Sequence, residues 1–319
     1  MRLSCAGNAL IDIIAFVETD FPSSIGLHGG STAHVSAADL EPVLAQLQGA
    51  SYGAGGGAAN TARVFASLGY PSSFAGSIGH DEYGRHYIAD MRQAGVESHL
   101  QVNPGHTGVF CVLIEPAGER TIVVGPGVAA QLDAERIPDA FFNPSSTLYL
   151  DGFLASSPDT LTVLVRRAKA AGMPVAFDVA GSRIAVRNRE LFLSLMRESC
   201  SWTFMNEDEF IALADVSVDD GLASFSADVP GVVIVKRAEI GAVCVSDGLI
   251  IESAVRPIQA TDTTGAGDAF AAGFMAAALS GSSLARCLRL GNRVAEHAIQ
   301  VPGIAMDTSV LRHAAAAVL

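Results

Sequence analysis

The stretch Asp262-Thr263-Thr264-Gly265-Ala266-Gly267-Asp268 is followed directly by an apolar run, residues 269–274, that is typical of a helix. Residues 250–258 before it are typical of a strand and a loop. Gly265, Ala266 and Gly267 are therefore predicted to lie where a loop turns into a helix. Small residues at such a place let backbone N–H groups converge on an anion, and the helix N-terminus adds partial positive charge. The sequence therefore predicts a phosphate site here.

Asp268 falls in the first turn of this predicted helix and has two interpretations. A carboxylate beside a bound phosphate could accept the proton of a hydroxyl that attacks a γ-phosphorus. An acidic residue is also common at the start of a helix, with no catalytic role. The stretch alone does not separate these two roles.

The composition limits the class of protein. The 319 residues are enough for one large α/β domain or two medium ones, and a chain that is half apolar and 17% charged can form a sizeable core. The 33 Asp and Glu residues against 20 Lys and Arg give a net charge of −13, which argues against nucleic acid or an anionic membrane as a partner. No apolar run approaches the roughly 18 residues that a membrane-spanning helix needs, and residues 1–17 lack the layout of a signal peptide.

The five cysteines are widely spaced, and no pair has metal-ligand spacing. We expect each to be a small core residue of a protein in a reducing cytoplasm. They are Cys5, Cys111, Cys200, Cys244 and Cys287.

Residues 3–6 and 10–17 are predicted strands joined across Gly7-Asn8, and the second contains a charge at Asp12. Because isoleucines flank Asp12, one interpretation is an outward-facing residue on a half-exposed strand. The other is a carboxylate on the surface of a sheet that accepts hydrogen bonds from a polyol.

A glycine-rich run, residues 53–59, precedes a predicted helix that ends near Leu68 with Gly69 as its cap. Glycines before a helix let a ligand approach the backbone. The run is a poor match to the dinucleotide-binding fingerprint, which needs G-x-G-x-x-G after a buried strand. Asn60 lies inside this helix although Asn is a poor helix former, so its amide either points at a ligand or faces solvent.

From residue 147 onward, predicted strands and helices alternate, which predicts a parallel sheet covered on both faces. Ligands of such sheets bind beyond the carboxyl ends of the strands. Asn206-Glu207-Asp208-Glu209 follows one of these strand ends. The acids suit a first helical turn, whereas Glu209 with Asn206 could instead organise Mg²⁺ and its waters.

Three of these stretches together resemble the signatures of one family, the ribokinase-like (PfkB-type) sugar and nucleoside kinases. Gly55-Gly56 followed by Asn60 resembles the first signature, and residues 262–268 resemble the second. Asn206 with Glu209 resembles the Mg²⁺/phosphate motif. The resemblance runs in order from Gly7 to Gly303, and residues 118–121 and 151–154 look closest to bacterial adenosine-kinase-like sugar kinases.

The resemblance implies a role for each matching residue. Asp268 would be the base and Gly265, Ala266 and Gly267 the anion hole, with Arg120 reaching the transferring phosphate. The sugar hydroxyls would be bound by Asn8, Asp12, Gly55, Gly56 and Asn60. ATP and Mg²⁺ would be bound by residues that include Asn206, Glu209 (to Mg²⁺ through water), Lys236, Gly241, Thr264 and Asn292. A K⁺ ion would lie near Asp262, Thr264 and the carbonyls around Gly303.

The implied fold is α/β, a doubly wound and mostly parallel central sheet flanked by helices, in one domain over residues 1–319. A small β-sheet lid would come from residues 11–17, 28–35 and 108–124. Members of the family often dimerise through their lids, so a homodimer is implied as well. Ala238 is a departure, because the family often has Gly in that loop.

The leading hypothesis is an ATP-dependent kinase that transfers the γ-phosphate to a primary hydroxyl of an adenosine-like nucleoside or a furanose sugar. The alternative is a non-catalytic sensor of a nucleoside or sugar on the same fold. A third class, an NAD-dependent oxidoreductase, fits the α/β alternation but lacks the dinucleotide fingerprint. Which sugar or nucleoside is bound does not follow from these residues.

Overall fold

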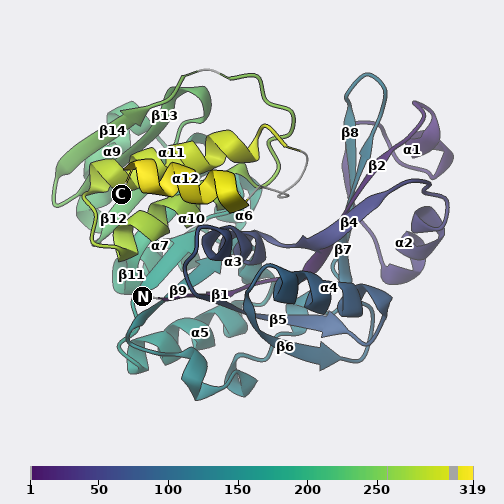
Figure 1. Ribbon diagram of the computed structural model, residues 1–319, viewed down its shortest axis with the longest axis horizontal. Helices are drawn as coiled ribbons and strands as arrows, with labels where there is room; N and C mark the ends of the chain where they lie inside the picture. The colour runs from purple at the N-terminus through teal and green to yellow at the C-terminus, as the bar shows by residue number, and fades with distance from the viewer. Residues whose placement is uncertain (1, 257, 302–307, 319) are drawn as a thin grey trace.

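Two sheets organise the chain in the computed structural model, which describes residues 2–256, 258–301 and 308–318 (Figure 1). The large sheet has nine strands in the order β14-β13-β12-β11-β10-β9-β1-β5-β6. All neighbours pair in parallel except β13 with β12 and β14. The strands are β1 (Arg2–Ala6), β5 (Ser72–Gly79), β6 (Glu97–Asn103), β9 (Ser146–Asp151), β10 (Val175–Asp178), β11 (Cys200–Asn206), β12 (Val232–Lys236), β13 (Gly241–Ser246) and β14 (Leu249–Ala254).

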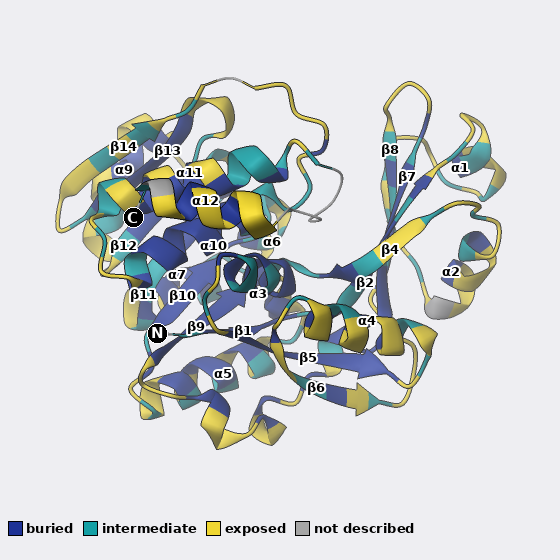
Figure 2. Ribbon diagram, in the orientation of Figure 1, coloured by how far each residue is buried: buried dark blue, intermediate teal, exposed yellow. Residues whose placement is uncertain are grey.

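Helices cover both faces of the large sheet, and each face has its own hydrophobic core. Along β9, Tyr149 belongs to one core while Leu148 and Leu150 belong to the other, because successive side chains of a strand point to opposite faces. Figure 2 shows the buried strands between the two helical layers. The first layer contains α3 (Gly57–Ser67), α4 (Glu82–Gln93), α10 (Ala266–Leu279), α11 (Leu284–Ala298) and α12 (Thr308–Val318). The second contains α5 (Pro158–Ala170), α6 (Ser182–Arg187), α7 (Arg189–Ser199), α8 (Glu207–Ala214) and α9 (Val218–Asp228).

The second sheet, which we call the small sheet, stands beside the large one at the right of Figure 1. Its order is β3-β8-β7-β2-β4, and α1 (Phe21–Ser24) and α2 (Ala37–Leu44) lie next to it. The three segments expected to form a lid all contribute strands, although their action as a lid stays a prediction. The strands are β2 (Leu10–Phe16), β3 (Thr32–His34), β4 (Ser51–Gly55), β7 (Gly108–Ile114) and β8 (Arg120–Gly125).

Some elements of the structure differ from the prediction. The glycine-rich run begins with a strand, β4, before its helix starts at Gly57. Strand β6 and helix α9 do not follow from the sequence, because both are largely exposed and carry a weak apolar pattern.

All five cysteines are buried and free, as the sequence predicts. Among the described residues, no helix combines the length and the apolar character that crossing a bilayer requires.

Candidate active site

The start of α10 carries Asp268 in its first turn. Gly265 precedes the helix with φ of 74°, a left-handed conformation that glycine adopts without strain. The first N–H groups of a helix have no partner within the helix, and its N-terminus carries partial positive charge. Of the three predicted anion-hole residues, Ala266 already donates its N–H to the Thr263 carbonyl at 3.2 Å. Despite this bond, the partial positive charge at this end of α10 can attract an anion to a place beside the Asp268 carboxylate.

Asn60, on α3, is hydrogen-bonded to Asp268. Its Nδ2 donates to Asp268 Oδ2 at 3.1 Å, and Thr61 Oγ1 donates to the Asp268 carbonyl at 3.4 Å. Asn60 is 5% exposed, and within the described chain its buried Oδ1 has no hydrogen-bond partner. The interpretation of Asn60 as a solvent-facing side chain is therefore wrong. One buried acceptor is left beside the Asp268 carboxylate, where a donor on a ligand could meet it.

Further carboxylates surround Asp268 at the carboxyl ends of the strands. Burial is the main cause that raises the pKa of Asp268 well above its usual range, and Asp178 and Asp151 raise it further. The hydrogen bond from Asn60 and the charge of Lys236 act in the opposite direction. Burial also raises the pKa of Asp151 to about 7, against the lowering effect of the Ala58 N–H. If all these carboxyls were ionised, their negative charge would exceed the positive charge of the one cation among them.

Lys236, the last residue of β12, is that cation. Its Nζ donates to Asp178 Oδ2 at 2.8 Å, and Tyr149 Oη donates to the same oxygen at 3.2 Å. Burial lowers the pKa of Lys236, but attraction to Asp178 and Glu209 outweighs it and the pKa is raised. A Cβ on Gly267 would lie 3.1 Å from Nζ, so the ammonium group lies against the first turn of α10.

The sequence does not single out Asp151 and Asp178 as site residues. They end the neighbouring parallel strands β9 and β10, are paired in register, and are 2% and 3% exposed. Asp151 Oδ2 accepts from the Ala58 N–H at 2.8 Å, which ties the start of α3 to the strand end. The signal that could have found them is an acid at the end of a buried strand, where α/β sheets bind ligands.

Asn206 and Glu209 form a complete capping box at the start of α8. Glu209 N–H donates to Asn206 Oδ1 at 2.8 Å, and Asn206 N–H donates to Glu209 Oε2 at 2.8 Å. The structural interpretation of this cluster is therefore confirmed. Glu209 is nevertheless 4% exposed, and burial raises its pKa to about 7 while Lys236 lowers it. A role toward Mg²⁺ stays a prediction.

The predicted sugar-binding residues converge where β2 meets β4. The Asp12 carboxyl lies across Gly55, where a Cβ would be only 2.1 Å from Asp12 Cγ. Gly56 has φ of 96°, and its Cβ would be 2.1 Å from the Asn8 carbonyl oxygen. Burial raises the pKa of Asp12 to about 7, and the Arg63 guanidinium lowers it. Asn8 Nδ2 donates to the Phe153 carbonyl at 3.3 Å, and its buried Oδ1 has no partner among the described residues.

Arg120 connects the small sheet to the loop before α10. Its Nη1 lies 3.3 Å from Asp262 Oδ1, which also accepts the Thr264 N–H at 3.0 Å. The second signature and the small sheet therefore meet at Asp262.

Two further predicted nucleotide-binding residues, Asn292 and Gly241, lie on α11 and at the start of β13. Asn292, on α11, donates to the Ser253 carbonyl at 2.8 Å. Gly241, with φ of 115°, begins β13. A Cβ on Gly241 would lie only 2.1 Å from the same Ser253 carbonyl oxygen, so no side chain fits there. Both thus meet at Ser253 on β14. Ala238 has φ of 45°, a conformation that favours the Gly the family often has there.

Within the described residues, no three His, Cys, Asp or Glu side chains are grouped as metal ligands. An ion at the cluster would thus need water or phosphate oxygens as further ligands, which is the usual mode for Mg²⁺. The excess of carboxylates around Lys236 suits such a divalent cation. The carbonyls around Gly303, expected near K⁺, fall outside the described residues.

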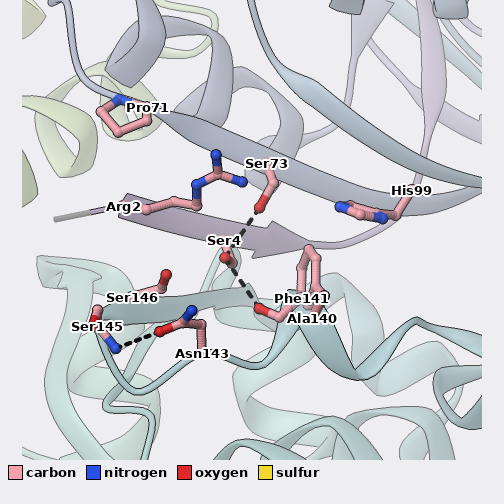
Figure 3. A pocket seen from close by; sticks show the side chains of 10 residues that line it. All are labelled: Arg2, Ser4, Pro71, Ser73, His99, Ala140, Phe141, Asn143, Ser145 and Ser146. Atoms are coloured by element: carbon pink, nitrogen blue, oxygen red, sulfur yellow. Dashed lines mark hydrogen bonds between the residues drawn. The ribbon is translucent and has the colours of Figure 1, made fainter.

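A cavity of about 330 Å³ lies at the other end of the strands of the large sheet, where β1, β5 and β9 begin (Figure 3). Ser73 Oγ donates to Ser4 Oγ at 3.0 Å, and Ser4 Oγ donates to the Phe141 carbonyl at 3.5 Å (Figure 3). The cavity is therefore separate from the Asp268 cluster.

Comparisons with known proteins show the family of this chain. The model of the pfkB family carbohydrate kinases matches residues 4–309. The chain belongs to this family. An ATP-dependent ribose-1-phosphate kinase from Halopiger xanaduensis is 31% identical, with 75% of this chain and 77% of that protein covered. The protein is thus an ATP-dependent kinase of a sugar or nucleoside.

Solved structures agree on the fold. The adenosine kinase from Sinorhizobium meliloti superposes with a TM-score of 0.88 at 30% identity, with 99% of both chains covered. A probable sugar kinase from Rhizobium etli has the same TM-score at 26% identity, with 99% of this chain and 98% of that chain covered. The ribokinase-like fold expected from the sequence is confirmed.

Proposed function

We propose that this kinase transfers the γ-phosphate of ATP to the primary hydroxyl of a nucleoside of the adenosine type, with Asp268 as general base. The observation that carries the proposal is the place of Asp268. It lies in the first turn of α10, hydrogen-bonded to Asn60 and close to Lys236. A proton acceptor and a phosphate-binding helix end thus occupy one spot.

The two oxygens of Asp268 have different tasks in this proposal. Oδ2 accepts the Asn60 amide, which fixes the orientation of the carboxylate. Oδ1 lies 3.4 Å from the position of a Cβ on Gly57, so the missing side chain leaves it open to a substrate hydroxyl. Because burial, and then the neighbouring carboxylates, raise the pKa of Asp268, a cation close by is needed to keep it ionised as a base.

Acceptors without donors support a polyol on the other side of Asp268. Asn60 Oδ1 and Asn8 Oδ1 are buried and have no partner among the described residues, and Asp12 offers a carboxylate. Leaving a buried acceptor unpaired costs about 1–3 kcal/mol, which a hydroxyl donor would remove. Vicinal ribose hydroxyls supply such donors.

On the phosphate side, ATP supplies the phosphoryl group and Mg²⁺ neutralises charge on its oxygens. The first turn of α10, Lys236 and Arg120 would hold the transferring group, with Glu209 positioning waters of the metal. K⁺ near Asp262 and dimerisation through the small sheet remain predictions of the family resemblance.

The small sheet favours a nucleoside over a free sugar. Alternation along β8 puts Arg120, Ile122 and Val124 on one face, and Arg120 reaches Asp262, so this face is turned toward the α10 loop. Register places Phe110 and Val112 of β7 on the same face. An apolar face opposite the polyol acceptors suits a nucleobase. The similarity to the adenosine kinase from Sinorhizobium meliloti points the same way.

The test is Asp268→Asn in the full chain. We expect adenosine affinity, measured by calorimetry, to change little while kcat falls by about 10²–10⁴. Asp159→Asn is the matched control, since Asp159 is an exposed acid in the first turn of α5. Near-normal turnover of Asp268→Asn would remove Asp268 as base.

A substrate panel tests the nucleoside part separately. We expect adenosine to give a higher kcat/KM than ribose, fructose or 2-keto-3-deoxygluconate, measured by ADP release. Preference for a free sugar would overturn the nucleoside assignment and leave the kinase assignment intact.

A further inference from the structure

Two glutamates face one another across the β7–β8 hairpin of the small sheet. Glu115 follows β7 and Glu119 precedes β8, and Glu115 N–H donates to the Glu119 carbonyl at 3.0 Å. Because Ile114 pairs with Arg120 in register, the two glutamates occupy the next opposed position and point to the same face. Like charges directly opposite one another destabilise a hairpin.

Both carboxylates turn to the backbone of Gly29 and Gly30. A Cβ on Gly29 would lie 3.2 Å from Glu115 Oε1 and 3.3 Å from Glu119 Oε2, so oxygens of both side chains converge on one point. Gly30 has φ of 71°, and its Cβ would be 2.6 Å from Glu119 Oε1. The two glycines thus leave space that the carboxylates fill.

The Glu115 side chain is buried there, and one of its carboxylate oxygens lacks a hydrogen-bond partner among the described residues. It is 5% exposed, and its Oε1 is inaccessible and accepts no hydrogen bond from any described residue. A buried carboxylate oxygen without a donor is unfavourable unless a cation or proton reaches it. Glu119 is exposed, so the cluster is open to solvent ions on one side.

The small sheet has no spare basic side chain for this pair. Residues 10–55 and 108–125 contain seven Asp and Glu and a single Arg or Lys, which is Arg120. Alternation places Arg120 on the other face of the hairpin, where it meets Asp262. His28, which directly precedes the two glycines, is exposed to solvent.

We propose that Glu115 and Glu119 bind a hard divalent cation of the Ca²⁺ class at the turn of the β7–β8 hairpin, on the face of the small sheet opposite Arg120. Carboxylate oxygens are the ligands such ions prefer, and Ca²⁺ accepts irregular geometry completed by backbone carbonyls and water. The ion would hold the hairpin against the Gly29–Gly30 loop. This site is independent of the active-site Mg²⁺, since it lies on the face opposite Arg120.

The experiment uses the full chain, free of nucleotide and treated with chelator, titrated with CaCl₂ and separately with MgCl₂. We expect Ca²⁺ to bind with Kd on the order of 10⁻⁴–10⁻³ M and to raise Tm by about 2–4 °C at tenfold excess over Kd. Glu115→Gln and Glu119→Gln should each abolish the shift. Glu41→Gln, an exposed acid on α2, should retain it.

Two results would overturn the proposal. One is a Tm shift of equal size in the wild type and in both hairpin variants, or no shift in any of them. The other is a shift that survives Glu115→Gln but is lost in Glu209→Gln, which would assign the ion to the active site. Glu119→Gln keeps the test valid if Glu115→Gln fails to fold, because Glu119 is exposed.

Discussion

At the scale of single residues, Gly55 and Asp12 show why the first signature needs glycine. The Asp12 carboxyl fills the space of a Gly55 side chain, with the would-be Cβ 2.1 Å from Asp12 Cγ. We expect Gly55→Ala to displace this carboxylate and weaken adenosine binding by about tenfold or more, since a charged hydrogen bond contributes roughly 1.5–3 kcal/mol. Calorimetry with adenosine measures the change.

Gly53→Ala is the matched control on the same strand. Its Cβ would meet only Asp90 Oδ2, at 3.4 Å, an ordinary contact. Equal losses of affinity in both variants would show that the strand, and not the position of Asp12, determines binding.

The residue scale also shows what the sequence can and cannot predict. Asp268 and Asn60 can each be named from local patterns, because glycines before a helix mark both places. Their hydrogen bond cannot be predicted, since it joins positions 208 residues apart. Asp178 escapes notice in the sequence because an acid after a short strand is also common in turns, and only the fold brings it beside Lys236.

At the scale of elements, the position of Asp268 depends on how α10 packs on α11. A Cβ on Gly273 would lie 2.8 Å from the Leu290 carbonyl, and one on Gly291 would lie 2.9 Å from the Phe270 ring. The helices therefore approach through bare glycine backbone. Repeating apolar residues predict both helices, but not this contact, since the glycines give no signal of which helix they face.

We predict that Gly273→Ala destabilises the protein by about 1–3 kcal/mol, because overpacking outweighs the roughly 1 kcal/mol that alanine adds to helix propensity. Denaturant unfolding measures the change. A stability gain in this variant would show that α10 and α11 can separate without penalty.

Strand β4 illustrates the limit of prediction for elements. Ser51–Gly55 contains two glycines and no apolar alternation, so the sequence favours a loop. It is a strand because it pairs antiparallel with β2 at the edge of the small sheet. Strands β9 to β12, whose apolar patterns are strong, alternate with helices along the chain as the sequence predicts.

At the scale of the whole molecule, Arg120 joins the small sheet to the loop before α10. Its ion pair with Asp262 is partly exposed, with 37% of the Arg120 side chain accessible, so it adds at most about 1 kcal/mol to stability. Its place beside the proposed phosphate site matters more. We predict that Arg120→Gln leaves Tm nearly unchanged but lowers kcat by about 10²–10³.

Steady-state kinetics and a thermal melt together measure this prediction. Arg166→Gln is the control, because Arg166 forms an exposed ion pair with Glu135 in the layer away from the site. A large loss of Tm with intact kcat would make Arg120 a structural link only.

The buried carboxylates give the whole molecule a distinct pH dependence. The pKa values of Asp12, Asp151 and Glu209 are about 7, raised mainly by burial, whereas unfolded carboxyls titrate near 4. Between these values the folded state binds more protons than the unfolded state, so stability falls as pH rises toward 7 and levels off above it. Burial lowers the pKa of His297, which opposes this trend at the acidic end.

We therefore predict that the nucleotide-free protein has a higher Tm at pH 5.5 than at pH 7.5. Asp12→Asn should reduce this difference, because the variant lacks one of the buried carboxyls whose ionisation destabilises the folded state. Asp159→Asn, which changes an exposed acid, should leave the difference intact. If Tm instead rose steadily to pH 7.5, these carboxyls would already be ionised in the free protein. The site would then hold its negative charge without a cation, and repulsion among the carboxylates would not create a need for Mg²⁺.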